Sequence, residues 1–511
     1  MLIRIILNWK GFLMLLDKMS SFRMMLGASL LVLMNLTSLT VAQEKNGPSY
    51  CYVDGLSDRL PCGFIQVAED SSKPQGRKID IHYVVIPAVK PVHPNEALLA
   101  IAGGPGQSAI DNAALFNNTF KKVRETRDIL LIDQRGTGRS NILQCPQDNI
   151  LSPLMVDEQG FDVIVETEKC LSNIESDLAM YDSSTAIHDF EAVRKFLGYE
   201  KLHVYGISYG SRMAQLYMRH YSEALLTVTL DGVVPMQQSV LAVGLSVDRA
   251  LEGVLEQCAA DAACNQQFPA LRSDLSSLTN DLTNNPVTTN VFHPMTGNPE
   301  TFLLTRDKLL GILRLSMYSP STRTLLPLAI NLAASGNYQP LLGLYSLIMN
   351  GIDLAAGMHN SVVCAEDVHR VSPDLMADIE QSYTANSMYE AMVKSCSIWP
   401  SIQVDEKFFN PIESDIPTLL LSGELDPATP PDWGTLAMAN MTNAAHFVAP
   451  YATHGVAAQT CGSDLVADLV DRGNVTDLDA SCLSETHSKS FYLNPSSAQA
   501  LQSKTTVEDS L

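Results

Sequence analysis

Residues 202–221, LHVYGISYGSRMAQLYMRHY, contain the pattern on which the fold assignment depends. A short apolar strand runs into Gly-x-Ser-x-Gly at residues 206–210, and a helical pattern follows at residues 211–221. So tight a turn between a strand and a helix needs small residues two positions before and two positions after its central residue, here Ser208. Such a turn presents its central residue at the end of a sheet. We expect Ser208 to be a nucleophile and the Tyr209 amide to bind an oxyanion; an ordinary strand–helix loop is the alternative.

A serine hydroxyl is a poor nucleophile without a base, and candidate partners follow later in the chain. Asp426 and His454 each come just after a predicted strand. The order Ser, Asp, His, with each residue at the carboxyl end of a strand, predicts a triad of Ser208, Asp426 and His454. The alternatives are Glu424 for the acid and His446 or His359 for the base.

A second oxyanion donor is expected from Gly-Gly-Pro-Gly at residues 103–106, which follows another predicted strand. Glycine lets a backbone amide approach a substrate oxygen closely, and Gly104 is the expected donor, with Gly103 next. A phosphate-binding loop is excluded because no Gly-Lys-Ser or Gly-Lys-Thr follows. A plain turn is the alternative.

Strand patterns alternate with helical patterns in two separate parts of the chain. Strands are expected at residues 79–86, 97–102, 128–133, 202–205, 225–230, 418–422 and 446–449, with helices at 183–197 and 211–221. Strands separated by helices form a mostly parallel sheet flanked by helices. We therefore predict an α/β core in two parts, residues 78–235 and 411–486, interrupted by a large, mainly helical cap at residues 236–410.

The net charge excludes some classes of protein. The 511 residues include 34 Lys and Arg against 56 Asp and Glu, which gives a formal net charge of −22. A general nucleic-acid binder needs a basic surface, and so does a protein that binds membranes through a polybasic face. Neither nucleic acid nor a membrane surface is therefore an expected partner.

The N-terminus has the pattern of an export signal. Residues 24–39 are mostly apolar, follow Arg23 and precede small residues, so we expect residues 1–42 to be a cleaved signal peptide, with an uncleaved signal anchor as the alternative. This predicts a secreted or periplasmic protein. Residues 43–77 form an N-terminal extension, and residues 487–511 form a polar tail that we expect to be loose.

The ten cysteines agree with export, because disulfides persist in oxidising compartments. Pairing of sequence neighbours is the expectation from short loops, although spacing alone does not fix connectivity. The expected pairs are Cys51–Cys62, Cys145–Cys170, Cys258–Cys264, Cys364–Cys396 and Cys461–Cys482. A metal site is not expected, since the sequence has no Cys-x-x-Cys and no His-Glu-x-x-His.

Four motifs together resemble the α/β-hydrolase superfamily, and more narrowly the proline iminopeptidase and tripeptidyl aminopeptidase group of serine exopeptidases. They are GGPGQS at residues 103–108, DQRGTGRS at 133–140, the turn at 206–210, and GELDP at 423–427 with His454. The resemblance extends over about residues 78–461. It implies an α/β-hydrolase fold and metal-free, cofactor-free cleavage of a peptide substrate from its free N-terminus.

One difference from the cytosolic proline iminopeptidases concerns specificity. Those proteins have a His before Gly-Gly-Pro-Gly, whereas this chain has Ala102, and its length, export signal and cysteines are more similar to the secreted tripeptidyl aminopeptidases. The motif at residues 133–140 is expected to be structural, with an Asp–Arg pair and glycines that hold a loop against the catalytic edge.

An exopeptidase must recognise a protonated α-amine, and a carboxylate is the obvious ligand. Glu366 and Asp367 follow Cys364 in the predicted cap. We hypothesise that Glu366 binds the amine with help from Asp367; a solvated acidic turn is the alternative.

Two other functions are compatible with these residues. An esterase or lipase would use the same triad on a different leaving group, and a catalytically inactive binding protein could share the fold. Epoxide or haloalkane hydrolysis is disfavoured, because it needs a carboxylate at the position of Ser208.

Overall fold

The computed structural model describes residues 49–497 except 146–152, 156, 159, 294–295 and 350–353. The expected signal peptide lies outside the described residues. The description below concerns the unit that begins at Pro48.

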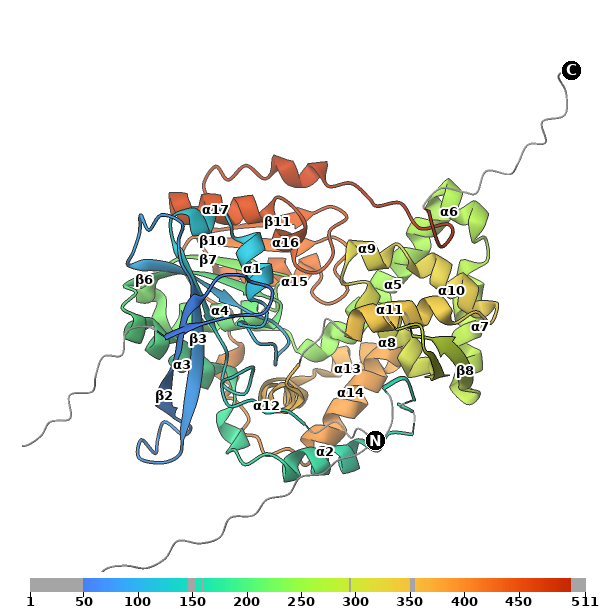
Figure 1. Cartoon of the computed structure of the whole chain (residues 1–511), viewed down its shortest axis with the longest axis horizontal. Coiled ribbons are helices and arrows are strands. Elements are labelled where there is room, and N and C mark those ends of the chain that lie inside the picture. Colours follow the sequence, from blue (N-terminus) through green and yellow to red (C-terminus); the bar gives the residue numbers. More distant parts are fainter. Residues whose placement is uncertain are drawn as a thin grey trace, which may run out of the picture. The chain divides into compact units, whose positions relative to one another are not determined.

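A nine-stranded sheet crosses this unit in the order β1-β2-β3-β5-β4-β6-β7-β10-β11 (Figure 1). Its strands are β1 (Ser49–Cys51), β2 (Leu60–Ala68), β3 (Lys78–Ile86), β4 (Glu96–Ile101), β5 (Asp128–Ile132), β6 (Lys201–Ile207), β7 (Leu225–Asp231), β10 (Thr418–Gly423) and β11 (Ala444–Ala449). The first three strands are antiparallel to their neighbours, and the six from β5 to β11 are parallel. The carboxyl ends of β4, β6, β7, β10 and β11 therefore share one edge of the sheet.

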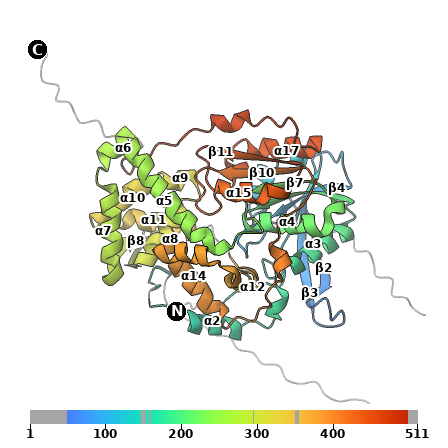
Figure 2. The ribbon, with the colours of Figure 1, turned by 180° about the vertical axis from the view of Figure 1, so that it is seen from behind.

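Helices cover both faces of the sheet because the strand residues are apolar on both faces. Buried side chains of β3 alternate between the two layers, with Ile81 and Tyr83 on one side and Val84 and Ile86 on the other. The first layer contains α3 (Ser183–Leu197) and α4 (Tyr209–Tyr221), which Figure 2 shows beside each other against the sheet. The second contains α1 (Ala113–Thr119), α16 (Val456–Gln459) and α17 (Gly462–Arg472). Two further helices are α2 (Val163–Ser172) and α15 (Pro431–Ala437).

The cap between β7 and β10 is mainly helical, as expected. Its helices are α5 (Val243–Ala260), α6 (Ala262–Gln267), α7 (Leu271–Asn284), α8 (Arg306–Ser316), α9 (Pro320–Arg323), α10 (Leu326–Ala334), α11 (Gln339–Met349), α12 (Ala356–Glu366), α13 (Pro373–Gln381) and α14 (Tyr383–Cys396). A hairpin of β8 (Val287–Phe292) and β9 (Pro299–Leu304), which sequence analysis did not anticipate, completes it.

The cap has an apolar core of its own, separate from the two layers of the sheet. Leucines of α5, α7, α8, α10 and α11 form it together with Phe302 of the hairpin. Phe491 and Leu493 also belong to this core, although they lie in the C-terminal segment that the sequence predicted to be loose. The segment was predicted to be loose because its composition is polar, but these two apolar residues are buried in it. A hydrogen bond also fixes the segment, since the main-chain N–H of Tyr492 donates to Thr324 O at 3.0 Å.

The covalent framework agrees with the sequence prediction. All five expected disulfides are present, each between neighbouring cysteines. Cys364–Cys396 joins α12 to α14, and Cys461–Cys482 joins the start of α17 to the segment that follows it. No helix among the described residues combines the length and apolarity needed to cross a membrane.

The predicted elements of the core are confirmed. Helix α3 spans the expected residues; its N-cap is Asp182, which accepts from the Thr185 N–H, and it ends at Gly198 in the left-handed region (φ 82°). The sheet also begins ahead of residue 78, because β2 pairs with β3 along most of its length.

Candidate active site

Ser208 occupies the turn that its sequence context predicts. It lies between β6 and α4 with φ 57° and ψ −127°, an unusual conformation for a residue with a side chain. A Cβ on Gly206 would lie 2.2 Å from Gly210 O, and a Cβ on Gly210 would lie 2.5 Å from Ile101 O. Only glycine fits at these two positions, so the turn that exposes Ser208 depends on them.

Asp426 and His454 form the ion pair that the triad prediction requires. Asp426 Oδ2 lies 2.8 Å from His454 Nδ1, and the Asp426 carboxylate also accepts from the Ala428 and Thr429 N–H groups and from the Thr429 hydroxyl. The Asp426 side chain is buried, and this would favour its neutral form. The charge and hydrogen bond of His454 outweigh burial and lower the pKa of Asp426.

The pKa of His454 is raised for the complementary reason. Burial disfavours the imidazolium, but the carboxylates of Asp426 and, to a smaller extent, Asp231 outweigh this effect. The pair favours a protonated imidazole, the form that results when histidine takes a proton from a nucleophile.

Ser208 and His454 approach the same point, the end of β7. The Ser208 N–H donates to Asp231 O at 2.9 Å, and a Cβ on the next residue, Gly232, would lie 3.0 Å from His454 Cε1. The Ser208 hydroxyl makes no hydrogen bond with the described residues, so the Ser–His contact is open in this structure. Such contacts are often long in the absence of substrate.

Asp231 is a site residue that sequence analysis did not single out. Its buried carboxylate accepts from the N–H groups of the first two residues of α16, which follow His454, and from the Tyr205 hydroxyl, all at 2.8 Å. Asp231 thus connects the nucleophile strand, the end of β7 and the histidine loop. The available signal was an acidic residue at the end of the apolar run 225–230.

The glycine loop after β4 lies against Ser208. A Cβ on Gly103 would lie 3.0 Å from Ser208 Cβ, whereas one on Gly104 would contact Leu354 of the cap at 3.0 Å. Gly104 has φ 111°, which favours glycine, and Tyr209 is the first residue of α4, where an amide has no partner within the helix. The roles of the Gly104 and Tyr209 amides remain predictions.

The motif at residues 133–140 holds two loops in place, but the expected Asp–Arg pair within it does not form. Asp133 accepts from the Ser108 hydroxyl at 2.6 Å and from the Arg139 N–H at 3.0 Å. Arg135 instead makes a bidentate pair with Asp189 of α3, at 2.7 and 2.9 Å. The Asp133–Ser108 and Arg135–Asp189 pairs are buried, so the structure agrees with a structural role for this motif.

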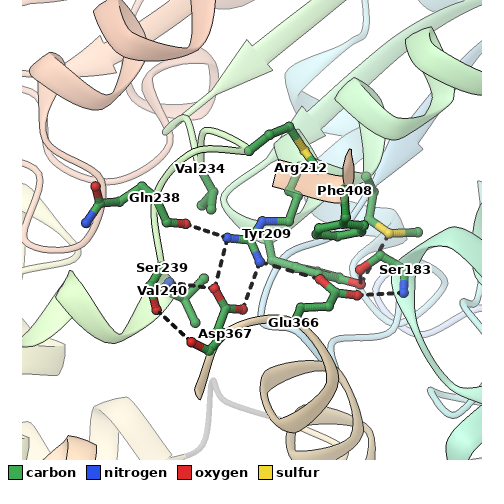
Figure 3. A network of polar contacts seen from close by, with 12 residues as sticks. Ser183, Tyr209, Arg212, Val234, Gln238, Ser239, Val240, Glu366, Asp367 and Phe408 are labelled. Atoms are coloured by element: carbon green, nitrogen blue, oxygen red, sulfur yellow. Dashed lines mark hydrogen bonds and ion pairs between the residues drawn. The ribbon is translucent and has the colours of Figure 1, made fainter. Parts of the chain in front are cut away.

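Glu366 and Asp367 lie in a buried network, and this corrects the sequence prediction for both residues (Figure 3). Asp367 pairs with Arg212 of α4 at 2.8 Å and with Arg370 at 3.0 Å, and Glu366 accepts from the Ser183 N–H at 2.8 Å. The alternative of a solvated acidic turn is wrong. Neither carboxylate is placed to bind an amine, because each is fully buried and already has partners.

The two carboxylates of this network differ in protonation. Burial, reinforced by Asp367, raises the pKa of Glu366 to about 7 in spite of Arg212. Burial also opposes the charge on Asp367, but Arg212 and Arg370 outweigh it and lower the pKa. The network connects cap helix α12 to α4, directly behind the nucleophile turn.

The alternative acid and bases have other partners. Glu424 is exposed and accepts from the Tyr451 N–H, and His446 Nε2 lies 2.9 Å from the Ser422 hydroxyl. His359 Nδ1 lies 3.3 Å from Pro105 O in the glycine loop. None of these three described residues forms a hydrogen bond with Ser208.

Comparisons with known proteins agree with this geometry. The family described as "alpha/beta hydrolase fold" matches residues 96–272, and the family described as "TAP-like protein" matches residues 381–482. Serine protease Hip1 of Mycobacterium tuberculosis is 24% identical over 404 residues, which cover 72% of this chain and 76% of that protein. Tripeptidyl aminopeptidase of Streptomyces lividans is 25% identical over 225 residues, 40% of this chain and 41% of that protein.

A further relative, the putative hydrolase YuaR of Escherichia coli K12, is 29% identical over 140 residues. This match covers 27% of the chain and spans only 28% of the length of YuaR. The sheet order, the turn at Ser208 and these matches together show that the chain has the α/β-hydrolase fold and is similar to α/β-hydrolase peptidases such as Hip1 and tripeptidyl aminopeptidase.

Proposed function

We propose that the chain is an exported serine aminopeptidase, which removes residues or short peptides from the free N-terminus of a peptide through an acyl-enzyme. The observation that supports this most is the His454–Asp426 pair, which lies at the carboxyl edge of the sheet beside the constrained turn of Ser208. The peptidase relatives support the choice of a peptide bond as the substrate bond.

In the first step of this mechanism, Ser208 Oγ attacks the carbonyl carbon of the scissile peptide bond and its proton passes to Nε2 of His454. The amides of Tyr209 and Gly104 donate to the oxyanion that forms. The C–N bond then breaks as His454 gives the proton to the leaving amine. The N-terminal part of the substrate remains esterified to Ser208.

In the second step, a water molecule replaces the leaving amine. His454 takes a proton from this water, the hydroxide attacks the ester, and the proton returns to Ser208 Oγ as the C–O bond breaks. Asp426 keeps the Nδ1 proton of His454 in place and stabilises the imidazolium in both steps.

A panel of fluorogenic mono-, di- and tripeptide substrates, each with a free or an acetylated N-terminus, tests this function. We expect the wild-type chain to cleave the free peptides, to discriminate against the acetylated ones, and to lose cleavage in the Ser208→Ala variant. Equal cleavage of free and acetylated peptides would contradict an aminopeptidase. Serine-dependent hydrolysis of simple esters without any peptide cleavage would favour the esterase alternative, and binding without turnover in the wild type would favour an inactive binding protein.

Export is part of the proposal and is supported by the five disulfides, which form and persist in oxidising compartments. We expect the mature chain to begin at Gln43 and to contain no thiol that reacts with a maleimide under denaturing, non-reducing conditions. N-terminal sequencing and intact mass of the protein recovered outside the cytoplasm check both points. A chain that keeps residues 1–42, or that is reduced, would contradict export with signal cleavage.

A further inference from the structure

Two parts of the cap border the proposed reaction centre. On the side of the glycine loop, the Ala355 N–H donates to Gly106 O at 3.0 Å. On the side of the histidine, the ring of Tyr318 meets the ring of His454, with centroids 5.1 Å apart and the ring planes at 71°. The cap therefore supplies a wall next to the loop that is expected to bind the oxyanion and a second wall, at Tyr318, next to the proposed base.

Hydrogen bonds hold the wall beside the histidine in place. Tyr318 lies just after the end of α8, and its carbonyl accepts from the Thr453 hydroxyl at 2.7 Å. Gln459, the last residue of α16, accepts from the Thr453 N–H at 3.1 Å and donates to His454 O at 2.5 Å. The histidine loop is thus bonded to the cap on one side and to α16 on the other, so the Tyr318 ring has a defined position against the imidazole.

A second cap helix contacts the partner of the histidine. Arg249 of α5 donates from Nη2 to the main-chain carbonyl of Asp426 at 2.5 Å. Asp426 in turn pairs with His454 at 2.8 Å. The loops that carry the two members of the pair are therefore both bonded to the cap, which fixes the cap wall relative to each of them.

The hydroxyl of Tyr318 is available to a ligand. The Tyr318 side chain is half-buried, and its hydroxyl makes no hydrogen bond with the described residues. A tyrosine that packs its ring against other side chains usually also gives its hydroxyl a partner. A substrate that binds beside His454 would supply one.

The proposed mechanism determines which part of the substrate lies there. His454 gives its proton to the leaving amine, so the leaving peptide has to pass within hydrogen-bond reach of His454 Nε2. The carbonyl oxygen of the scissile bond lies instead toward the amides of Tyr209 and Gly104. Because Tyr318 contacts His454, it lies on the leaving side of the scissile bond.

We propose that Tyr318 forms the subsite for the first residue of the leaving peptide: its hydroxyl donates to the main-chain carbonyl of that residue, and its ring positions His454. This inference rests on the proposed aminopeptidase function and deepens it, because it names a residue that favours a peptide over a simple alcohol as the leaving group.

The first test is Tyr318→Phe, assayed on substrates that share one N-terminal fragment and differ only in the leaving group, a peptide or p-nitrophenol. We expect kcat/KM to fall about 3- to 10-fold for the peptide, as for the loss of one neutral hydrogen bond, and less than about twofold for the ester. Tyr338→Phe, which removes the hydroxyl of another half-buried tyrosine of the cap, is the matched control and is expected to change neither value. Equal falls for both substrates in Tyr318→Phe overturn the role of the hydroxyl.

The acyl-enzyme tests the same subsite without peptide cleavage. When it is formed from the ester, an added amino acid amide competes with water: its amine attacks the ester carbonyl, the new C–N bond forms, the C–O bond to Ser208 breaks, and His454 passes the proton of the amine to Ser208 Oγ. We expect the ratio of new peptide to free acid to fall about 3- to 10-fold in Tyr318→Phe. This ratio does not depend on the fraction of folded protein, and an unchanged ratio overturns the subsite.

Tyr318→Leu tests the ring. Leucine keeps an apolar side chain but removes the ring that lies against His454, so we expect kcat on the ester to fall about 10- to 100-fold with little change in KM. Tyr318→Phe restores the ring and is expected to restore this kcat. A Tyr318→Leu variant with the kcat of the wild type overturns the positioning role, and so does a Tyr318→Phe variant that loses as much ester kcat as Tyr318→Leu.

Failure of this inference can be distinguished from failure of the proposed function. A wild-type chain that hydrolyses the ester but cleaves no peptide overturns the aminopeptidase function, whereas the partition of the acyl-enzyme, which needs only the ester, still decides the role of Tyr318. Peptide cleavage by the wild type together with an unchanged partition in Tyr318→Phe overturns the inference alone.

Discussion

At the scale of single residues, the site depends on side chains that fix the backbone as much as on those that react. Asp231 accepts the nucleophile N–H on its main chain and caps α16 with its carboxylate. Gly206 and Gly210 leave room for the turn that exposes Ser208. Substitutions at these positions change how the backbone holds Ser208 and His454 without removing a group that reacts.

Asp231→Asn removes a charge that raises the pKa of His454 and leaves one of two amide donors without an acceptor. We expect the free energy of unfolding to fall by about 1–3 kcal/mol. We also expect the acid limb of the kcat/KM profile to move to lower pH, because a neutral His454 is the base in the proposed mechanism and its pKa falls. A pH–rate profile and urea unfolding check both, with Glu424→Gln as the exposed control. An unshifted acid limb would contradict the electrostatic role of Asp231.

Gly206→Ala places a methyl group against the Gly210 carbonyl, and the backbone has to move. We expect a loss of about 3 kcal/mol or more in stability and loss of reaction with a serine-directed fluorophosphonate probe. Gly253→Ala in α5, where a Cβ meets no atom within 4 Å, should instead stabilise by up to about 1 kcal/mol. Similar effects of the two substitutions on stability would contradict a steric requirement at the turn.

At the scale of elements, the link between α12 and the core is unusual because it is ionic and fully buried. Arg212 of α4 faces Glu366 and Asp367 at the end of α12 (Figure 3). The Cys364–Cys396 disulfide joins the same helix to α14. A buried pair of this kind is costly to break, since removal of one partner leaves an uncompensated charge. It holds the segment that contacts the glycine loop at a defined place on the core.

The protonation of Glu366 makes this link pH-dependent. Its pKa is raised to about 7 in the folded chain, against about 4.5 when unfolded, so the folded state loses stability as pH rises between these values. We expect Glu366→Gln to gain on the order of 3 kcal/mol relative to wild type on going from pH 5 to pH 8. Parallel guanidinium unfolding at the two pH values measures the difference, and an equal effect at both would show that Glu366 does not titrate in this range.

The elements that sequence patterns predicted well are those with local signals. The turn at Ser208 and the ends of β10 and β11 follow from strand periodicity and small residues, and the structure confirms these elements. The burial of Glu366 was not predictable in this way. A charged pair after a cysteine resembles a surface turn in sequence. Its buried position is tolerable because tertiary partners, among them Arg212 and the Ser183 N–H, satisfy the carboxylates.

At the scale of the whole molecule, the apolar core of the cap shares no residue with the two apolar layers of the sheet. Tertiary contacts decide which segments of the chain join each core. Phe491 and Leu493 complete the cap core from a segment far along the chain, on either side of the exposed Tyr492. The hairpin of β8 and β9 escaped prediction for a related reason. These strands are short and few of their side chains are buried, so they carry little periodicity. The contacts that define them come from α11 and from the helical turn Pro153–Met155, which is distant in sequence.

Phe491→Ala tests whether the cap depends on this segment. Removal of a buried phenyl ring leaves a cavity, so we expect a loss of about 3–5 kcal/mol in the stability of the cap. Phe292→Ala, an exposed residue of the same cap (63% exposed), should change stability by less than about 0.5 kcal/mol. Hydrogen exchange of α7 and α10 resolves the cap from the sheet, and equal protection in both variants would contradict the role of Phe491.

The position of Phe491 and Leu493 also bears on how the protein is made. These two residues follow every strand of the sheet along the chain, so the interior of the cap lacks part of its packing until they dock. A chain that enters its compartment N-terminus first can therefore form the sheet and the turn at Ser208 before the cap is complete.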